Sequence, residues 1–257
     1  MRITSWNFLH GQGLEPGGAS SADEALTLCL NVIASDVIAL QEVDCNQERS
    51  GGANQIEEIA RELGAQWWRF APTLSGTPGV AWGKYNGGEE CSYGIGIIST
   101  IPVVDWLQLD LRRSLIGMPL AVGSESGKMR LMYIKDEPRI ALAAVMENGW
   151  TVINTHLSFV PLVNIYQFLK LSRWAKKIES EYSTRVLLVG DFNLPWGIPS
   201  KITRWKRATQ ALSYPSWNPK ISFDYIFARQ ENLSHLREVE IPALNISDHR
   251  PVSVEVN

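Results

Sequence analysis

The chain has 257 residues, of which 45% are hydrophobic and 20% are charged, and its formal net charge is -3. This composition excludes an intrinsically disordered chain and a fibrous protein, and the length fits one large domain that buries its own core. The slightly negative charge excludes a broadly basic nucleic-acid-binding surface, although it leaves room for a local basic patch.

The first quarter of the chain alternates strands with helices. Residues 2–8 and 36–40 have the composition of short buried strands. A helix is predicted between them because residues 21–24 have the spacing of a capping box and apolar residues follow at helical period. A second helical period over residues 56–63 ends at Gly64, which is a typical stop after a helix. This alternation indicates an α/β layered fold.

Most of the later predicted elements are strands. They lie at residues 67–71, 94–99, 130–135, 140–146, 150–155, 186–189, 221–228 and 252–256. A turn signal at residues 147–149 joins two of them into a hairpin, and a helix is predicted over residues 163–182. Because hairpins and helices are mixed, two packed sheets flanked by helices fit better than one parallel sheet. The lack of a linker or repeat favours one domain over residues 1–257.

Polar residues that could carry chemistry recur in or at the ends of the predicted strands. They are Asn7, Glu42, Asn154, His156, Asp191, Asn193, Asp224, Ser247, Asp248 and His249. Strand ends open onto loops, where active sites are commonly built on a rigid scaffold. Each residue alone has an ordinary explanation, since an Asp after a strand is usually a cap or turn residue. The whole set in this order points instead to an active site.

Seven segments that include these residues resemble the endonuclease/exonuclease/phosphatase family. The segments are Trp6-Asn7, QEVD at 41–44, YGIGIIS at 93–99, NTHL at 154–157, GDFN at 190–193, DYIF at 224–227 and SDHRPV at 247–252. The resemblance covers nearly the whole chain, and GDFN and SDHRPV are specific motifs. It implies a four-layer α/β/β/α sandwich of two mostly antiparallel sheets flanked by helices. It also implies a metal-dependent phosphoric-ester hydrolase.

Four acidic residues of these motifs are expected to meet in one pocket: Glu42, Asp191, Asp224 and Asp248. Carboxylates that lie so close repel one another unless something compensates their charge. Mg²⁺ is the natural compensation, with Mn²⁺ as a substitute, because it prefers oxygen ligands and binds through carboxylates and substrate phosphate. The resemblance implies that Glu42 is the principal ligand, with help from Asn7 and Asp248.

The resemblance assigns proton transfer and water activation to further residues. His249 and Asp224 would form an imidazole–carboxylate pair that contacts the scissile phosphate or moves protons. Asp191 would orient or deprotonate the attacking water, and Asn193 would hold that water or a phosphate oxygen. The reaction is then an in-line attack of water on phosphorus without a covalent enzyme intermediate.

The resemblance implies roles for four residues near the scissile phosphate. His156 would donate a hydrogen bond to the phosphate or to the leaving oxygen, and Asn154 would support it. Tyr93 would place its hydroxyl on a phosphate oxygen, or it is a buried aromatic residue at the start of a strand. Arg139, directly before a predicted strand, is a further candidate for a phosphate contact or else an exposed arginine.

The substrate is less well defined than the chemistry. Basic residues lie at Lys170, Arg173, Lys176 and Lys177, and again around Trp205 at Lys201, Arg204, Lys206 and Arg207. They would grip a nucleic-acid backbone while Trp205 stacks on a base; a solvated helix face and a packed Trp explain them equally well. The first hypothesis is a nuclease acting on DNA or RNA. The second is a phosphoesterase acting on a phospholipid headgroup or a small phosphate ester.

A third hypothesis, a non-catalytic binding module on the same scaffold, is disfavoured because no expected site residue has been lost. The three scattered cysteines, Cys29, Cys45 and Cys91, argue against a disulfide framework and predict a reducing, cytoplasmic location. No apolar run of about 18 residues occurs, so no membrane anchor is expected. The N-terminal residues lack the apolar core of a signal peptide, so none is expected. No obligate protein partner is expected either.

Overall fold

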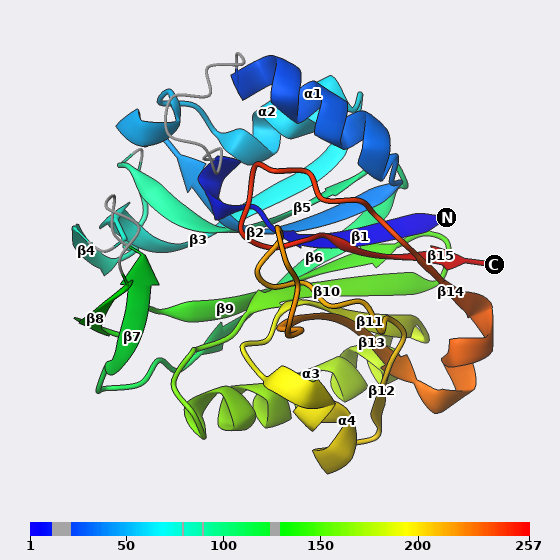
Figure 1. The fold of residues 1–257 in the computed structure, drawn as a ribbon. Helices are drawn as coiled ribbons and strands as arrows, with labels where there is room; N and C mark the ends of the chain where they lie inside the picture. The colour runs from blue at the N-terminus through cyan, green and yellow to red at the C-terminus, as the bar shows by residue number, and fades with distance from the viewer. Residues whose placement is uncertain (12–21, 79, 89, 124–128) are drawn as a thin grey trace.

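Two β-sheets packed face to face, with helices on their outer faces, make up the four layers of the protein (Figure 1). The computed structural model describes residues 1–11, 22–78, 80–88, 90–123 and 129–257. The fold class predicted from the sequence is confirmed, and most strand pairs in both sheets are antiparallel.

The first sheet has seven strands. In spatial order they are β14 (Leu236–Val239), β15 (Val252–Val256), β1 (Arg2–Asn7), β2 (Val37–Cys45), β5 (Ser92–Ser99), β3 (Trp67–Thr77) and β4 (Ala81–Lys84). Only β1 and β2 run parallel in this sheet, and α1 (Ala22–Ile33) connects them. The second helix, α2 (Gln55–Glu62), packs beside α1 on the same outer face (Figure 1). The first and last strands of the chain, β1 and β15, are neighbours in this sheet.

The second sheet has six strands. In spatial order they are β12 (Trp205–Arg207), β13 (Asp224–Arg229), β11 (Arg185–Asp191), β10 (Trp150–His156), β9 (Arg139–Met146) and β6 (Val103–Leu111). The parallel pair β10–β11 is joined by the long helix α3 (Val163–Tyr182), which covers the outer face together with α4 (Ile198–Ile202). Short 3-10 helices lie at Leu9–Gly11, Glu48–Ser50, Pro195–Gly197 and Gln230–His235.

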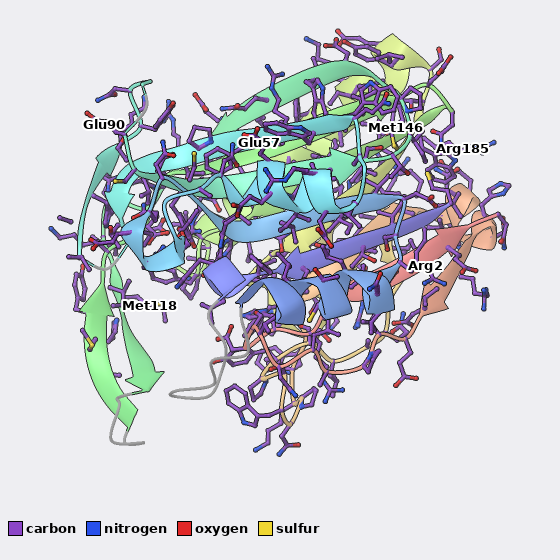
Figure 2. All side chains as sticks on the ribbon, turned by 90° about the horizontal axis from the view of Figure 1, so that it is seen from above. Arg2, Glu57, Glu90, Met118, Met146 and Arg185 are labelled. Carbon is purple, nitrogen blue, oxygen red and sulfur yellow. The ribbon has the colours of Figure 1, made fainter. Side chains whose placement is uncertain are left out.

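A separate two-stranded ribbon, β7 (Met118–Gly123) and β8 (Met129–Ile134), projects from one end of the sandwich. Figures 1 and 2 both place it at the end opposite the chain termini; in Figure 2, Met118 marks the ribbon and Arg2 marks the other end. This ribbon forms one wall of a groove that is described below.

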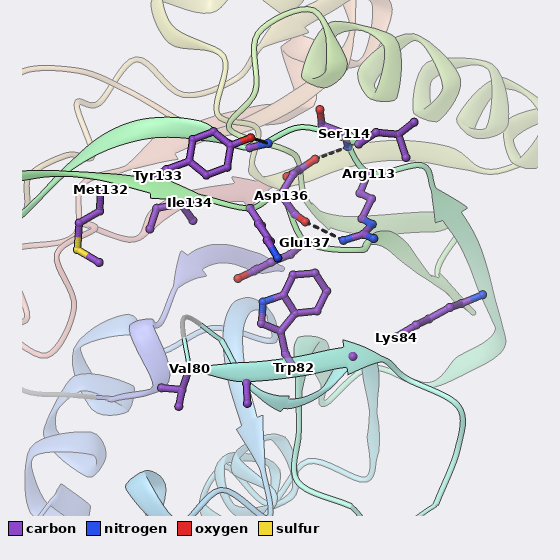
Figure 3. Close-up of a pocket in the computed structure, with 15 residues that line it drawn as sticks. Val80, Trp82, Lys84, Arg113, Ser114, Met132, Tyr133, Ile134, Asp136 and Glu137 are labelled. Carbon is purple, nitrogen blue, oxygen red and sulfur yellow. Dashed lines mark hydrogen bonds between the residues drawn. The ribbon is translucent and has the colours of Figure 1, made fainter.

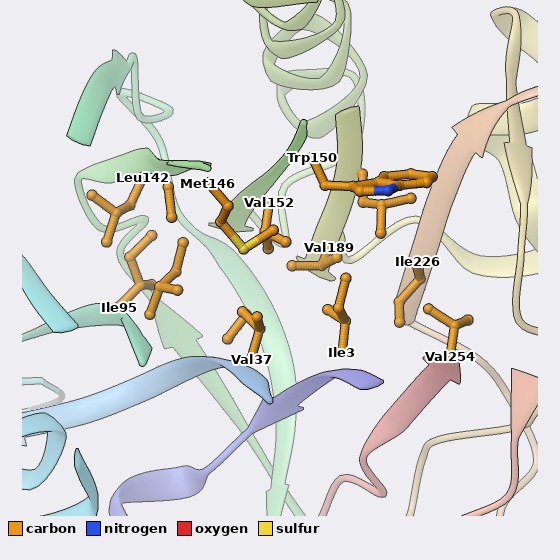
Figure 4. Packing of buried hydrophobic residues seen from close by; sticks show 14 of the residues in the cluster. Ile3, Val37, Ile95, Leu142, Met146, Trp150, Val152, Val189, Ile226 and Val254 are labelled. Atoms are coloured by element: carbon orange, nitrogen blue, oxygen red, sulfur yellow. The ribbon is translucent and has the colours of Figure 1, made fainter. Parts of the chain in front are cut away.

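The main core lies between the two sheets, where apolar side chains from both inner faces interdigitate (Figure 4). Ile3, Val37 and Val254 approach from the first sheet, and Val152 and Val189 approach from the second. Because side chains alternate along a strand, the next residues point outward and pack under the helices in two further clusters. The central strands β5, β9 and β10 are buried along their whole length, since both of their faces are covered.

Most predicted elements are confirmed, and the differences have local reasons. The helix over residues 163–182 is confirmed, as is the stop at Gly64, which has φ +63° and donates to the Arg61 carbonyl. Strand β2 does not end at residue 40 but continues to Cys45, and β13 begins at Asp224 rather than at residue 221. Ser21, the first residue of the predicted capping box, lies outside the described residues.

Candidate active site

Three polar residues form a row across neighbouring strands of the second sheet. His156 ends β10, Asp191 ends β11 and Asp224 begins β13; the register pairs His156 with Asp191 and Asp191 with Asp224. Register partners present their side chains to the same face, only a few ångströms apart. The His156 Nε2 lies 3.6 Å from the Asp191 Oδ2.

Glycine at position 190 is required for this row. Its φ is +139°, and a β-carbon added there would lie 1.9 Å from the Thr155 carbonyl oxygen. The glycine therefore lets β11 pass close to β10 immediately before Asp191. The Gly-Asp pair of the GDFN motif is thus explained: the glycine permits the close approach of the strands, and the aspartate joins the polar row.

The first sheet contributes Asn7, at the end of β1, and Glu42, which occupies a β-bulge in β2. The register with β5 skips Glu42, passing from Gln41 to Val43, and Glu42 has φ +56°. A bulge bends the strand and re-aims a side chain. The Asn7 Nδ2 donates to the Glu42 Oε1 at 3.0 Å and to the Asp191 Oδ2 at 3.2 Å. One amide therefore links carboxylates from both sheets.

His249 completes the cluster from the loop before β15. Its Nδ1 lies 2.7 Å from the Asp224 Oδ2, and its Nε2 lies 4.0 Å from the Asp191 Oδ2. The loop is held in place because Ser247 Oγ donates to the Asn7 carbonyl and Trp6 Nε1 donates to the His249 carbonyl. The imidazole orientation is thus fixed by both sheets.

Asp248, between these two anchors, is half-buried. Burial raises the pKa of its carboxyl group, which His249 lowers and Glu42 raises further. The side chain therefore lies within electrostatic range of both the imidazole and the Glu42 carboxylate.

The two site histidines have opposite charge preferences. Burial opposes charge on His249, but the carboxylates of Asp224, Asp191 and Asp248 together outweigh it and raise the pKa of His249 to about 10. Burial, reinforced by Arg139 and His249, holds the pKa of His156 well below its usual value. Burial and Asp224 raise the pKa of Asp191 to about 7. Titratable groups whose pKa values are pushed apart in this way are typical of acid–base chemistry.

Arg139 and Tyr93 lie beside the carboxylates and have little access to solvent. Arg139 is 5% exposed, lies 3.6 Å from Glu137 and 4.0 Å from Asp136, and its buried Nε has no hydrogen-bond partner among the described residues. An unmet buried donor is costly, so this guanidinium is suited to an incoming anion. Burial and the nearby Glu42 raise the pKa of Tyr93 well above its usual value, so its hydroxyl remains a donor.

Sequence reasoning missed Glu137, which lies among these groups. Burial raises the pKa of Glu137, while the nearby Arg139 lowers it. The charged run Asp136-Glu137 directly before β9 was the only available signal, and such runs are usually solvated.

Asn193 holds the loop that follows β11. Its peptide N–H donates to the Asp191 Oδ1 at 2.9 Å, and its side-chain amide donates to the Leu157 carbonyl at 3.0 Å. It therefore orients Asp191 directly, and only its side-chain oxygen remains to hold a water.

Asn154 joins the two sheets. Fully buried, it donates to the carbonyls of Leu40 and Gly96 at 2.8 Å each and accepts from the Gln41 Nε2 at 2.7 Å. Its amide therefore binds groups of the opposite sheet, and any support that it gives His156 passes through the position of β10.

Replacing Asn154 by alanine should lower the free energy of unfolding by about 2–4 kcal/mol, because it leaves buried polar groups of the opposite sheet without a partner. Urea denaturation measures this loss. Asn218→Ala, at an exposed loop position, is the matched control and should change stability little. A stable Asn154→Ala protein with a large loss of turnover would contradict the structural role.

The basic segment around Trp205 does not offer that ring to a substrate. Trp205 is 0% exposed, donates to the Ser172 Oγ at 2.8 Å, and has the Arg229 guanidinium 4.1 Å from its ring centre. The interpretation of Trp205 as a base-stacking platform is wrong, and the alternative of a packed Trp is confirmed.

The donor set of the cluster fits a hard divalent cation. Asp191, Asp224 and His249 offer atoms within 4.8 Å of one another, but the His249 Nδ1 is already bound to Asp224. Glu42, whose side chain is 20% exposed, shares the Asn7 amide with Asp191, and the buried Asp224 Oδ1 has no partner among the described residues. Carboxylate oxygens with open coordination positions are the ligands that a hard, oxygen-seeking cation prefers.

Comparison with known proteins identifies a family. The sequence model of the Endonuclease/Exonuclease/phosphatase family matches residues 4–249. A search of curated proteins by sequence gives no match. No helix in the described part of the chain is long and apolar enough to cross a membrane.

Several solved structures share the fold. A family protein from Beutenbergia cavernae is 18% identical with a TM-score of 0.63, covering 100% of this chain and 72% of that one. The catalytic domain of human nocturnin with a bound sulfate anion is 17% identical with a TM-score of 0.65, covering 99% and 93%. A mannosyl-6-phosphatase from Bacteroides thetaiotaomicron is 13% identical with a TM-score of 0.60, covering 100% and 99%. At these identities the likeness concerns the fold alone.

Proposed function

Because the chain belongs to the endonuclease/exonuclease/phosphatase family, whose members are metal-dependent phosphoesterases and nucleases, we propose that this enzyme is a Mg²⁺-dependent phosphodiesterase acting on DNA or RNA. The observation that carries the proposal is the row His156–Asp191–Asp224 with His249 bonded to its last member. This row places two imidazoles around one carboxylate, which supplies a proton acceptor and two donors for water attack on a phosphate.

Glu42 is the principal metal ligand in this proposal, with Asp248 and Asn7 beside it. The hydrogen bonds from Asn7 to Glu42 and Asp191 support the assignment, since they hold two carboxylates at one place. A bound Mg²⁺ would supply Lewis acidity that stabilises negative charge on the phosphate.

Asp191 orients the attacking water and accepts its proton, because its carboxylate is fixed by the Asn7 amide and the Asn193 peptide N–H. The water oxygen forms the new bond to phosphorus as the bond to the leaving oxygen breaks in line. His249, kept protonated by Asp224, donates to a phosphoryl oxygen. Neutral His156, positioned by β10 and Asn154, donates to the phosphate or the leaving oxygen. Tyr93 and Arg139 supply further donors to the phosphate.

Two further features of the chain support proposals about its domain organisation and its cellular location. The core between the sheets unites residues from Ile3 to Val256, so residues 1–257 are proposed to fold as one domain. The thiols of Cys29, Cys45 and Cys91 are free, which favours a reducing compartment such as the cytoplasm.

A substrate panel tests the proposed function. We expect Mg²⁺- or Mn²⁺-dependent cleavage of DNA or RNA oligonucleotides that stops on chelation and is lost in Glu42→Ala and His249→Ala. Preferred release of phosphate from a sugar phosphate, or of a headgroup from a phospholipid, would instead support the second hypothesis. Wild-type protein that cleaves none of these esters with either ion would support the non-catalytic binding module.

A further inference from the structure

A groove of about 750 Å³ lies next to the candidate active site, between β4, the loop before β7 and strand β8 (Figure 3). Its lining includes Val80, Trp82, Lys84, Arg113, Leu115 and Tyr133. Glu137 also lines the groove, and its carboxylate lies 3.6 Å from the Arg139 guanidinium of the site. The groove therefore adjoins the candidate active site at Glu137.

Two aromatic rings face this groove from opposite walls. Trp82 is half-buried and rises from β4 toward Asp136 and Glu137 on the other side (Figure 3). Tyr133 of β8 is 62% exposed, and its hydroxyl is held by the Gly117 N–H at 2.7 Å. Both rings therefore present apolar surface at fixed positions.

The β3–β4 hairpin fixes Trp82 through a close backbone approach. Gly76, the register partner of Trp82, has φ +87°, and a β-carbon there would lie 2.3 Å from the Ala81 carbonyl oxygen. Only glycine fits this position, so the hairpin backbone is held close at Trp82.

Three exposed cations line the groove: Lys84, Arg113 and Lys135. The Arg113 guanidinium lies 5.4 Å from the centre of the Trp82 ring and donates to the Asp136 carbonyl at 3.3 Å. A second hollow of about 440 Å³ shares Trp82, Lys84, Arg113 and Leu115 with the groove. The Arg113–Trp82 pair thus serves two adjoining hollows, which suits consecutive units of one strand.

We propose that this groove binds the nucleotides next to the scissile phosphate of a single-stranded nucleic acid, with a base stacked on Trp82 and phosphates near Lys84, Arg113 and Lys135. Aromatic faces interleaved with cations are the chemistry that holds unpaired strands, because every base has a stacking face and every linkage carries a charge. Bases in a duplex are already stacked on one another and are not free to stack on Trp82. The inference deepens the proposed function and rests on it for the position of the scissile phosphate.

Exposed apolar residues near the groove, Leu115, Ile116 and Leu131, raise the alternative of a lipid surface. Two observations favour nucleic acid. Cations, rather than apolar side chains alone, line the groove beside its rings. The segment that joins β7 to β8 reads Ser-Glu-Ser-Gly-Lys and contains no apolar side chain that would enter a membrane.

Binding is measured in the His249→Ala background with Mg²⁺, so that cleavage does not intervene. The probes are a labelled single-stranded oligothymidylate, an abasic oligomer of the same length, and vesicles of zwitterionic and anionic phospholipids. Trp82→Ala should weaken oligothymidylate binding about tenfold to hundredfold and leave the abasic oligomer nearly unchanged. Trp67→Ala, a half-buried Trp at the opposite end of β3, is the matched control.

The charge contribution is tested by Lys135→Glu against Arg61→Glu, at an exposed arginine of α2. Lys135→Glu should weaken both oligomers and lower the slope of log affinity against log salt by about 1. Equal losses on both oligomers in Trp82→Ala, or binding to vesicles but not to oligothymidylate, would overturn the inference. A protein that binds oligothymidylate through Trp82 but hydrolyses no ester would overturn the proposed hydrolysis and leave the groove assignment intact.

Discussion

In His249→Ala, kcat falls about 10²- to 10³-fold for every ester that the wild-type protein hydrolyses, which is the range for loss of one donor that stabilises negative charge in the transition state. The structure explains the size of the effect. The imidazole bonds to Asp224 at 2.7 Å on one side and faces Asp191 at 4.0 Å on the other. No other described histidine except His156 lies in this cluster.

The comparison variants separate chemistry from folding. His249→Ala leaves the buried Asp224 carboxylate without its partner, so some loss of stability accompanies the loss of rate. His249→Gln restores a donor to Asp224 and should recover stability without recovering turnover. His235→Ala, at a half-buried histidine in the 3-10 helix before β14, is the control. It should keep the turnover and the stability of the wild-type protein.

A double-mutant cycle with Asp224→Asn tests whether the two residues act as a unit. Because the carboxylate holds the imidazole in its charged form, we expect the double variant to be no slower than His249→Ala alone. Losses that multiply in the double variant would show that Asp224 acts independently of His249, and the proposed pair would then be wrong.

The sequence predicted most of the fold because the buried strands are continuous apolar runs. It placed the end of β2 too early for a physical reason. Gln41 and Glu42 are polar, and polar residues after an apolar run usually mark the end of a strand. In the folded protein Gln41 is buried and donates to Asn154 of the other sheet, while Glu42 occupies the bulge. Gln41 is explained by a contact between the sheets and Glu42 by a bulge within its own sheet, and local periodicity contains neither.

The groove was not predictable from the sequence. Leu131, Met132 and Tyr133 are consecutive apolar or aromatic residues, a pattern typical of a buried strand, yet all three are exposed on β8. Their exposure follows from the ribbon's pairing only with β7, away from both sheets. The candidate site residues, by contrast, lie in short specific motifs, so they could be named without knowing that β10, β11 and β13 are neighbours.

Replacing Asp191 by asparagine is expected to lower kcat by at least as much as the loss of His249, and in the presence of a chelator to raise the thermal midpoint. Burial and Asp224 raise the pKa of Asp191 from 3.8 to about 7. Between about pH 4 and pH 7 the folded protein therefore keeps a proton that the unfolded chain has released. The free energy of unfolding falls as the pH rises through this window, and the whole contribution is lost above it.

Asp191→Asn carries no such charge, so at about pH 8 without metal it should melt a few degrees above the wild-type protein, and the difference should shrink toward pH 4. Mg²⁺ should reverse the order, because it stabilises the wild-type carboxylates more than the variant. Scanning calorimetry across pH, with chelator and then with Mg²⁺, measures both effects, and Asp110→Asn at an exposed position of β6 serves as the control. If Mg²⁺ raised the midpoints of Asp191→Asn and the wild type equally, Asp191 would not belong to the cation's surroundings. Mg²⁺ would then bind the folded protein without offsetting the charge of Asp191.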